Sequence, residues 1–166
     1  MRKSKTATRQ PARGNLVVGV ISDTHGRMDP RALDALRDSD IILHAGDIGS
    51  EGILGKLRDI APVHAIVGNV DIPPLTSKYP ATDVVEFGGS SFYMLHNVKA
   101  LDLHPRAAGF AAVIFGHSHK PEFYFENGVL FFNPGSAGPR RFSLPIAVGK
   151  IRIENGELLP EIVILD

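Results

Sequence analysis

The chain has 166 residues, of which 43% are hydrophobic and 22% are charged, as is typical of a single globular domain. Its 18 basic and 18 acidic residues cancel, so no overall charge draws it to nucleic acid or to a membrane, and we expect neither as a partner. The absence of cysteine excludes disulfides, thiolate metal sites and a cysteine nucleophile, and no apolar run approaches the roughly 18 residues of a membrane-spanning helix.

The first fourteen residues, MRKSKTATRQPARG, differ in composition from the rest of the chain. They contain five basic residues and no acidic residue, and they lack the apolar segment of a secretory signal. This composition predicts a basic flexible tail over residues 1–14, with nucleic-acid contact or an organelle address as the alternatives. We predict one domain over residues 15–166 and a cytoplasmic location.

The first half of the domain alternates between strand and helix patterns. Strands are predicted over three apolar runs: 15–22, 40–46 and 62–68. Helices are predicted over 29–38 and 51–60, the first with Asp29 as its N-cap and Pro30 in its first turn. This alternation implies parallel strands joined by right-handed crossovers.

The second half is dominated by hairpin signals. Two strands surround a Gly-Gly turn within 83–95, and Asn-Gly pairs predict hairpins over 121–133 and 149–165. A strand over 111–115 and a short helix near 104–110 lie between them. We therefore predict an α/β (α+β) fold in which two mixed β-sheets pack together with helices outside.

Polar groups follow six of the predicted strands, often in turns that contain glycine. Apart from the NPGS sequence at 133–136, the polar residues at these strand ends are Asp23, His25, Asp47, Asn69, His96, His117 and His119. Ligands of α/β sheets bind beyond the carboxyl ends of parallel strands, where loops from several strands converge. We therefore expect these seven side chains to share one site.

The chemistry of this set indicates metal binding. Carboxylates, imidazoles and a carboxamide suit Mn²⁺, Fe²⁺, Zn²⁺, Ni²⁺ or Co²⁺. Seven side chains are more than the three protein ligands of a typical catalytic zinc, and they match two ions about 3.5–4 Å apart that share a bridging carboxylate. Two adjacent cations favour a negatively charged substrate, for which a phosphate ester is the obvious candidate.

Each of these residues also has an ordinary structural interpretation. Asp23 and Asp47 fit turn or capping positions, and Asn69 fits a left-handed turn. His96 fits a core histidine, and the His-x-His pair at 117–119 is weak evidence for a metal by itself. The shared position at strand ends favours a common site over independent structural roles.

Five motifs resemble those of the calcineurin-like metallophosphoesterases, most closely the small bacterial and archaeal phosphodiesterase branch. In chain order they are SDTHG, HAGD, GNVD, FGHSHKP and NPGS, and the resemblance covers residues 16 to about 165. It implies a four-layer αββα sandwich with a dinuclear metal centre. One ion would be held by Asp23, His25, Asp47 and His119. The other would be held by Asp47, Asn69, His96 and His117, with Asp47 as the bridge.

One motif departs from the pattern of this branch. Around His96 the branch usually has histidine-glycine-histidine, but this chain has LHNV, with Asn97 and Val98. The loss of the second histidine predicts lower or narrower activity. The residue after Asn69 is Val70, as is usual in the small branch, where larger members carry a histidine that acts as general acid.

The resemblance implies hydrolysis of a small phosphodiester by in-line attack of a metal-bridging hydroxide, with the seven residues acting through two divalent ions. Mn²⁺ is the first expectation, and Ni²⁺, Fe²⁺, Co²⁺ and Zn²⁺ are alternatives. The main alternative function is a metal-binding but weak or inactive scaffold, similar to the metallophosphoesterase-like subunit of retromer. A nuclease is less expected because the chain has no net positive charge, and a homo-oligomer is left open.

Further residues are candidates for supporting roles. We expect His44, Asp71 and Asn133 to orient ligands, although His44 also fits a core position. Four basic residues are candidates for contact with substrate phosphate, although solvated loop charges are the simpler interpretation of most: Arg27, Lys120, Arg140 and Arg141.

Overall fold

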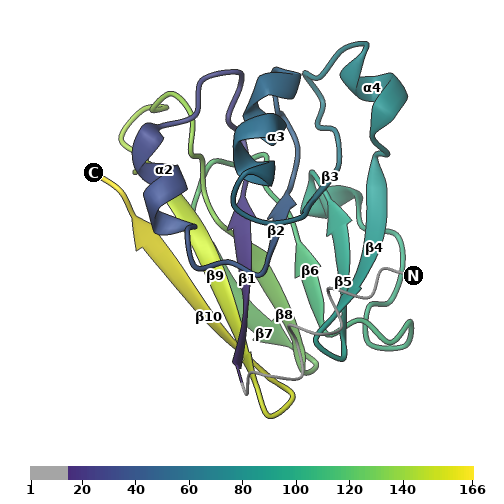
Figure 1. Cartoon of the computed structure of the whole chain (residues 1–166). Coiled ribbons are helices and arrows are strands. Elements are labelled where there is room, and N and C mark those ends of the chain that lie inside the picture. Colours follow the sequence, from purple (N-terminus) through teal and green to yellow (C-terminus); the bar gives the residue numbers. More distant parts are fainter. Residues whose placement is uncertain (1–14) are drawn as a thin grey trace, which may run out of the picture.

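The computed structural model describes residues 15–166, and the predicted basic tail over residues 1–14 lies outside the described residues. The described chain forms two five-stranded β-sheets that pack against each other (Figure 1). This arrangement confirms the predicted sandwich of two mixed sheets.

The first sheet carries the alternating half of the sequence and the C-terminal hairpin. Its order is β10-β9-β1-β2-β3. The strands are β1 (Asn15–Ile21), β2 (Ile41–His44), β3 (Val63–Ala65), β9 (Ala147–Glu154) and β10 (Glu157–Ile164). β1 pairs in parallel with β2, and β2 with β3, as the sequence predicted, while β9 and β10 add in antiparallel fashion.

The second sheet has the order β4-β5-β6-β8-β7. Its strands are β4 (Thr82–Phe87), β5 (Ser90–Leu95), β6 (Ala112–Ile114), β7 (Glu122–Glu126) and β8 (Val129–Asn133). β5, β6 and β8 run parallel in the centre, and β4 and β7 are antiparallel edge strands. In each sheet, the loops that follow the parallel strands therefore begin at the same edge of the sheet.

The apolar core lies between the sheets. Side chains two positions apart on β1, Val18 and Val20, are fully buried there with Phe92 of β5 and Phe132 of β8. This spacing places both valines on one face of the strand. Ile21 belongs to the opposite face, where it packs in a second cluster with residues of the helices.

Helices cover the outer face of the first sheet (Figure 1). They are α2 (Pro30–Ala35) and α3 (Glu51–Arg58), while the unpredicted α4 (Leu75–Lys78) lies beyond the end of β4 and adds Leu75 to the same apolar cluster. The Asp29 side chain accepts a hydrogen bond from the backbone amide of Arg31, which confirms the predicted N-cap of α2. Within residues 15–166, no helix is both long and apolar enough to span a membrane.

The outer face of the second sheet is covered mainly by irregular chain. Leu101 and Phe110 pack on its outward side chains, which include Tyr93 and Phe131. The helix predicted near 104–110 is wrong, because this segment forms turns; Gly109, at φ 87°, lies at their end. A short 3-10 helix, η2 (Val98–Ala100), lies just before it.

Candidate metal centre

The loops that follow β1 and β2 run side by side at one end of the sandwich. Backbone amides of Asp23 and His25 donate to the carbonyls of Gly46 and Asp47, at 3.0 and 2.9 Å. The loop after β6 joins them, because the amide of His117 donates to Asp23 Oδ2 at 3.0 Å. Strand ends that are distant in the sequence are therefore held together by hydrogen bonds from backbone amides.

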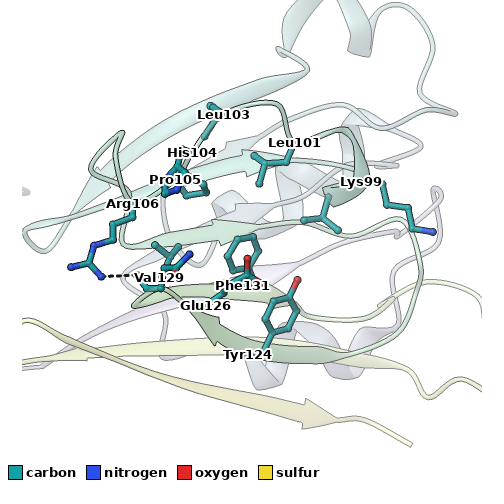
Figure 2. Close-up of a pocket in the computed structure, with 12 residues that line it drawn as sticks. Lys99, Leu101, Leu103, His104, Pro105, Arg106, Tyr124, Glu126, Val129 and Phe131 are labelled. Atoms are coloured by element: carbon teal, nitrogen blue, oxygen red, sulfur yellow. Dashed lines mark hydrogen bonds between the residues drawn. The ribbon is translucent and has the colours of Figure 1, made fainter.

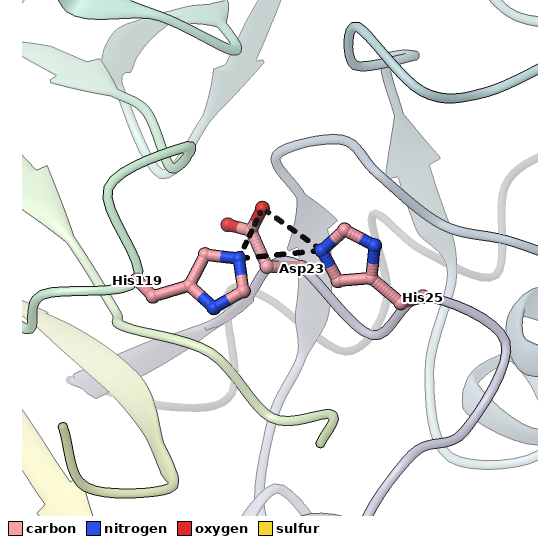
Figure 3. Close-up of side chains that lie close together, drawn as sticks. All are labelled: Asp23, His25 and His119. Atoms are coloured by element: carbon pink, nitrogen blue, oxygen red, sulfur yellow. Dashed lines mark hydrogen bonds and ion pairs between the residues drawn. The ribbon is translucent and has the colours of Figure 1, made fainter. Parts of the chain in front are cut away.

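A first group of metal-binding side chains consists of Asp23, His25 and His119 (Figure 3). Asp23 Oδ1 lies 3.7 Å from His25 Nε2 and 3.4 Å from His119 Nε2. The two imidazole nitrogens are 3.2 Å apart. Three donor atoms from two distant segments thus converge on one point, as the ligands of a cation do.

A second group consists of Asp23, Asp47 and His96. His96 Nε2 lies 3.2 Å from Asp47 Oδ2 and 3.7 Å from Asp23 Oδ1. The other ring nitrogen, Nδ1, is 2.7 Å from the carbonyl of Ala45, and it must be the donor because a carbonyl only accepts. In the neutral ring the lone pair of Nε2 then points at two carboxylates.

That arrangement fits a bound cation. Asp23 Oδ1 and His96 Nε2 are buried and have no hydrogen-bond partner within the described residues. Buried polar atoms are normally paired, and a lone pair facing carboxylate oxygens is repulsive unless a positive charge lies between them. The two groups together match a dinuclear centre in their donor chemistry.

Asp23 belongs to both groups and is fully buried. Burial raises the pKa of its carboxyl, but the nearby imidazoles of His119, His25 and His96 outweigh burial and hold the pKa well below its ordinary value. The family resemblance makes Asp47 the bridge, and Asp47 Oδ2 does lie 3.8 Å from His25 Nε2. Both carboxylates therefore face both groups.

Asn69 and His117 lie beside these groups. His117 Nδ1 is 3.2 Å from Asn69 Oδ1, and the His117 ring meets the His96 ring edge-on with centroids 5.2 Å apart. The backbone amide of Val70, next to Asn69, donates to Asp47 Oδ1 at 3.0 Å. All seven predicted residues thus lie in one contact network, and their individual roles as ligands remain predictions.

The carboxylate of Asp71 links two loops of the site by hydrogen bonds. Its carboxylate accepts backbone hydrogen bonds from Ile48, Gly49 and Gly68, at 3.1, 3.0 and 2.9 Å. It therefore fixes the loop that carries Asp47 to the loop that carries Asn69. This is the orienting role that the sequence suggested.

His44 is a completely buried histidine at the end of β2. Its Nδ1 accepts from the amide of Gly46 at 3.1 Å, so Nε2 carries the proton and donates to Thr24 Oγ1 at 3.0 Å. Burial lowers its pKa to about 4, which keeps the ring neutral. The hydroxyl of Thr24 in turn donates to the carbonyl of Ile48 at 2.8 Å, a role that the sequence did not reveal.

Asn133 and Ser136 support the site through the backbone. The Asn133 amide donates to the carbonyl of Gly116 and to Ser118 Oγ, both at 3.0 Å, and so orients the loop with the two histidines. Ser136 Oγ donates to the carbonyl of Asp23 at 2.9 Å. This bond gives the buried serine a structural role.

The backbone at the site is left-handed at five of the seven predicted residues. Their φ values are 55° at Asp23, 48° at His25, 55° at Asp47, 72° at His117 and 65° at His119. Residues other than glycine adopt this conformation at a cost of roughly 1–2 kcal/mol each. Such strain concentrates at functional sites, and no sequence pattern had indicated it.

The predicted phosphate-binding cations differ in their partners. Arg140 forms an ion pair with Asp166 and donates to the carbonyl of Leu144, and Lys120 lies 3.9 Å from Glu122. The Arg141 guanidinium has no such partner within residues 15–166. Asp23 raises the pKa of His25, and the charge of Arg141 opposes that rise.

A separate cavity of about 420 Å³ opens on the outer face of the second sheet (Figure 2). Leu101, Val129 and Phe131 form much of its apolar wall, with Lys99 and Arg106 at opposite ends. It shares no residue with the two Asp/His groups. The metal chemistry therefore lies outside this cavity.

Comparison with known proteins identifies the family. The model of the calcineurin-like phosphoesterase superfamily domain matches residues 16–156. The chain belongs to the calcineurin-like phosphoesterase superfamily. The expected family is thereby confirmed, and with it the small archaeal and bacterial branch.

Two archaeal relatives and one solved structure illustrate the match. The "Probable metallophosphoesterase" of Methanothermobacter thermautotrophicus is 30% identical and aligns with 89% of this chain and 92% of its own. A phosphodiesterase of Methanocaldococcus jannaschii is 25% identical, over 71% of this chain and 82% of its own. The structure of Vacuolar Protein Sorting 29 from Cryptosporidium parvum is 18% identical with a TM-score of 0.73, covering 93% of this chain and all (100%) of that one, and this likeness shows the fold alone.

Proposed function

We propose that the protein hydrolyses phosphodiester bonds with the help of two divalent metal ions. The observation that carries this proposal is the convergence of two Asp/His groups on one shared carboxylate, with Asp23 Oδ1 and His96 Nε2 buried and unpaired. Membership of the phosphoesterase superfamily and the 25% identity to a phosphodiesterase support the reaction class.

The residues present fit the two ions. Asp23, His25 and His119 would contribute to one site, and Asp23, Asp47 and His96 to the other, with Asn69 and His117 close enough to complete them. When bound, the two cations would lower the pKa of a water molecule toward neutrality and offset the negative charge of the phosphoryl group. Mn²⁺ is the ion we propose first, because hard oxygen donors share the site with imidazole.

The protein's own contribution is to hold these donors in place before substrate arrives. Asp71, His44 and Asn133 fix the loops by hydrogen bonds to backbone groups, so the donor atoms need little rearrangement. Phosphorus is then attacked by water in line with the leaving oxygen, without a covalent enzyme intermediate. The protein supplies no histidine next to Asn69 to protonate that oxygen, so esters with acidic leaving groups are favoured.

The departure at Asn97 has a local structural role. Its side-chain oxygen accepts a hydrogen bond from the amide of Lys99 at 3.0 Å and caps η2. Asn97 takes the place of the glycine that the branch usually carries after His96, and Val98 takes the place of its second histidine. We propose that this change narrows the activity without removing it.

The test is hydrolysis of bis(p-nitrophenyl) phosphate by metal-stripped protein refilled with Mn²⁺, beside an Asp47→Asn variant. Metal-dependent turnover that the variant loses supports the phosphodiesterase. A second candidate is a metal-binding scaffold, which the fold likeness to Vacuolar Protein Sorting 29 favours. Two bound ions with no turnover for any of the expected metals would support the scaffold and contradict the enzyme.

A further inference from the structure

Each of the two carboxylates at the metal centre turns one oxygen toward the histidines. Asp23 Oδ1 lies 3.4 Å from His119 Nε2 and 3.7 Å from the Nε2 atoms of both His25 and His96. Asp47 Oδ2 lies 3.2 Å from His96 Nε2 and 3.8 Å from His25 Nε2. The other oxygen of each carboxylate accepts hydrogen bonds from the protein. Each carboxylate therefore presents a single oxygen to both groups of ligands.

The second oxygen of Asp23, Oδ2, is held by two donors. The hydroxyl of Ser22 lies 2.7 Å away and the backbone amide of His117 lies 3.0 Å away. An ionised carboxylate only accepts hydrogen bonds, so the Ser22 hydroxyl is the donor, at the length of about 2.5–2.7 Å that is typical of a charge-assisted bond. The carbonyl of Gly46 is a much longer alternative for the same proton, at 3.5 Å. The hydroxyl of Ser22 is thus committed to Asp23.

A glycine packs directly against this pair. A Cβ atom at Gly116 would lie 2.1 Å from Ser22 Oγ and 2.6 Å from Asp23 Oδ2. Gly116 does not have a positive φ, so the lack of space, and not the backbone conformation, requires glycine here. Ser22 and Asp23 are both fully buried. Asp23 Oδ2 therefore lies in a closed and tightly packed place where water does not substitute for the serine.

Asp47 is held in the same way, but without a side-chain donor. Its Oδ1 accepts from the backbone amide of Val70 at 3.0 Å, and a Cβ atom at Gly68 would lie 2.2 Å from this oxygen. Within residues 15–166, the Ser22 hydroxyl is the only side-chain group that donates to either of the two oxygens turned away from the histidines. Ser22 is therefore the point at which a substitution can release one carboxylate and leave the backbone unchanged.

We propose that Ser22 is a positioning residue of the metal centre: its hydroxyl holds Asp23 Oδ2, so that Asp23 binds the ions through Oδ1 alone. This proposal rests on the proposed two-metal function and adds a residue that acts through Asp23. A carboxylate that binds an ion through both oxygens fills one more coordination position than a carboxylate that binds through one. The hydroxyl of Ser22 thus keeps that position free for water or for a phosphoryl oxygen of the substrate.

Infrared spectroscopy distinguishes the two binding modes. The antisymmetric and symmetric stretching bands of a carboxylate lie further apart when one oxygen binds a metal ion than when both oxygens do. The measurement is the difference spectrum between metal-stripped and Mn²⁺-loaded protein, with isotopically labelled aspartate carboxyls to identify the bands. For the wild type we expect the widely separated pair of bands alone.

The decisive variant is Ser22→Ala, which removes the hydroxyl at little change in volume. We expect a closely spaced pair of bands to appear and the Mn²⁺ affinity to fall roughly tenfold to a hundredfold, as for other groups that orient ligands. The matched control is Ser39→Ala. Ser39 is also buried, its hydroxyl has no hydrogen-bond partner in the described part of the chain, and it precedes β2, whose opposite end leads to Asp47. Both readouts should stay at the wild-type values in this control.

A second serine separates control of the carboxylate from general support of the loop. Ser136 Oγ donates to the backbone carbonyl of Asp23 at 2.9 Å and makes no contact with its carboxylate. Ser136→Ala should therefore leave the separation of the bands at the wild-type value, whatever its effect on Mn²⁺ affinity. The same spectral change in Ser136→Ala as in Ser22→Ala would overturn the specific role of the Ser22 hydroxyl.

Failure of this inference is distinguishable from failure of the proposed function. A wild-type protein that binds no Mn²⁺ contradicts the two-metal function itself. If the wild type binds Mn²⁺, closely spaced bands in the wild type or an unaltered spectrum in Ser22→Ala would overturn the role of Ser22 and leave metal-dependent hydrolysis intact. The spectrum of the wild type needs no variant, so it decides the matter even if Ser22→Ala does not fold.

Discussion

The hairpin tips and the metal-binding loops both use left-handed backbone, but they place it on different residue types. At two hairpin tips the positive φ falls on Asn127 and Asn155, each followed by a glycine. In the loops after β1, β2 and β6 it falls on aspartate and histidine: Asp23, His25, Asp47, His117 and His119. Glycine adopts this conformation without steric cost, whereas asparagine, aspartate and histidine adopt it more often than other residues but still at some cost.

The difference shows what each region is built for. At the hairpins the residue and the conformation agree, so the turns stabilise the fold. At the metal-binding loops the conformation aims carboxylates and imidazoles at common points, and hydrogen bonds from Asp71, His44 and Asn133 hold it there. Changes in the metal-binding loops should therefore affect activity first, and changes at the hairpins should affect stability alone.

The largest effect is expected for Asp23→Asn. Asp23 Oδ1 contacts both groups of ligands, so the amide weakens both metal sites at once. We expect at least about a thousandfold loss of metal-dependent kcat, since the ions supply the reactive water. Asn127→Ala at a hairpin tip is the control; retention of full activity by Asp23→Asn would contradict the assignment.

His44 should give stability a dependence on pH. Its pKa is about 4 in the folded protein against an ordinary 6.5, so between these pH values the unfolded chain binds a proton that the folded chain does not. The free energy of unfolding should therefore fall as the pH drops from 6.5 to about 4, by roughly 3 kcal/mol in all. Above pH 6.5 His44 is neutral in both states and does not lower the stability. Urea unfolding of wild type and His44→Asn across this range measures the difference, and parallel profiles would refute the assignment.

Asp71→Asn tests the bracing of the loops. Three backbone amides now donate to the two carboxylate oxygens of Asp71. Asparagine offers only one side-chain oxygen, and its NH₂ group would face at least one of these amide donors. We expect Mn²⁺ affinity to fall by roughly tenfold to a hundredfold, as for other residues that orient ligands. Calorimetric titration measures it, with Asp38→Asn, which removes a surface partner of Lys150, as the matched control.

The smallest effect is expected at a hairpin tip. Gly156 has a φ of 80° and no atom near the position of a Cβ, so Gly156→Ala adds backbone strain without a clash. The free energy of unfolding should fall by about 1 kcal/mol and the activity should stay at the wild-type level. If the activity falls by more than the fraction of folded protein does, the prediction that hairpin tips affect stability alone is contradicted.

Several features of the fold were predictable because they depend on local pattern. Apolar runs located β1 and β2, and Asn-Gly pairs located the tips of the β7–β8 and β9–β10 hairpins. The strand over 62–68 was predicted too long, since only Val63–Ala65 pairs with its neighbour. α4 was missed because its four residues, LTSK, are too few to show a helical period.

The motifs predicted that seven polar side chains lie together, which the structure shows, but they did not predict how the donor atoms are arranged. The motifs named all seven residues because each follows an apolar strand. They did not reveal that Asp23 lies in both groups, since that depends on the left-handed backbone of its loop. They also could not show which ring nitrogen of His44 carries the proton, because its contacts with Gly46 and Thr24 decide this.

Counting the ions tests the central claim most directly. Metal-stripped wild-type protein and Asp23→Asn should be titrated with Mn²⁺ in a calorimeter, and the metal content confirmed by elemental analysis. Our account predicts two ions per wild-type chain and weakened binding of both in the variant, because Asp23 faces both groups of ligands. A wild-type protein that binds one ion or none, or a variant that binds two with unaltered affinity, would contradict it.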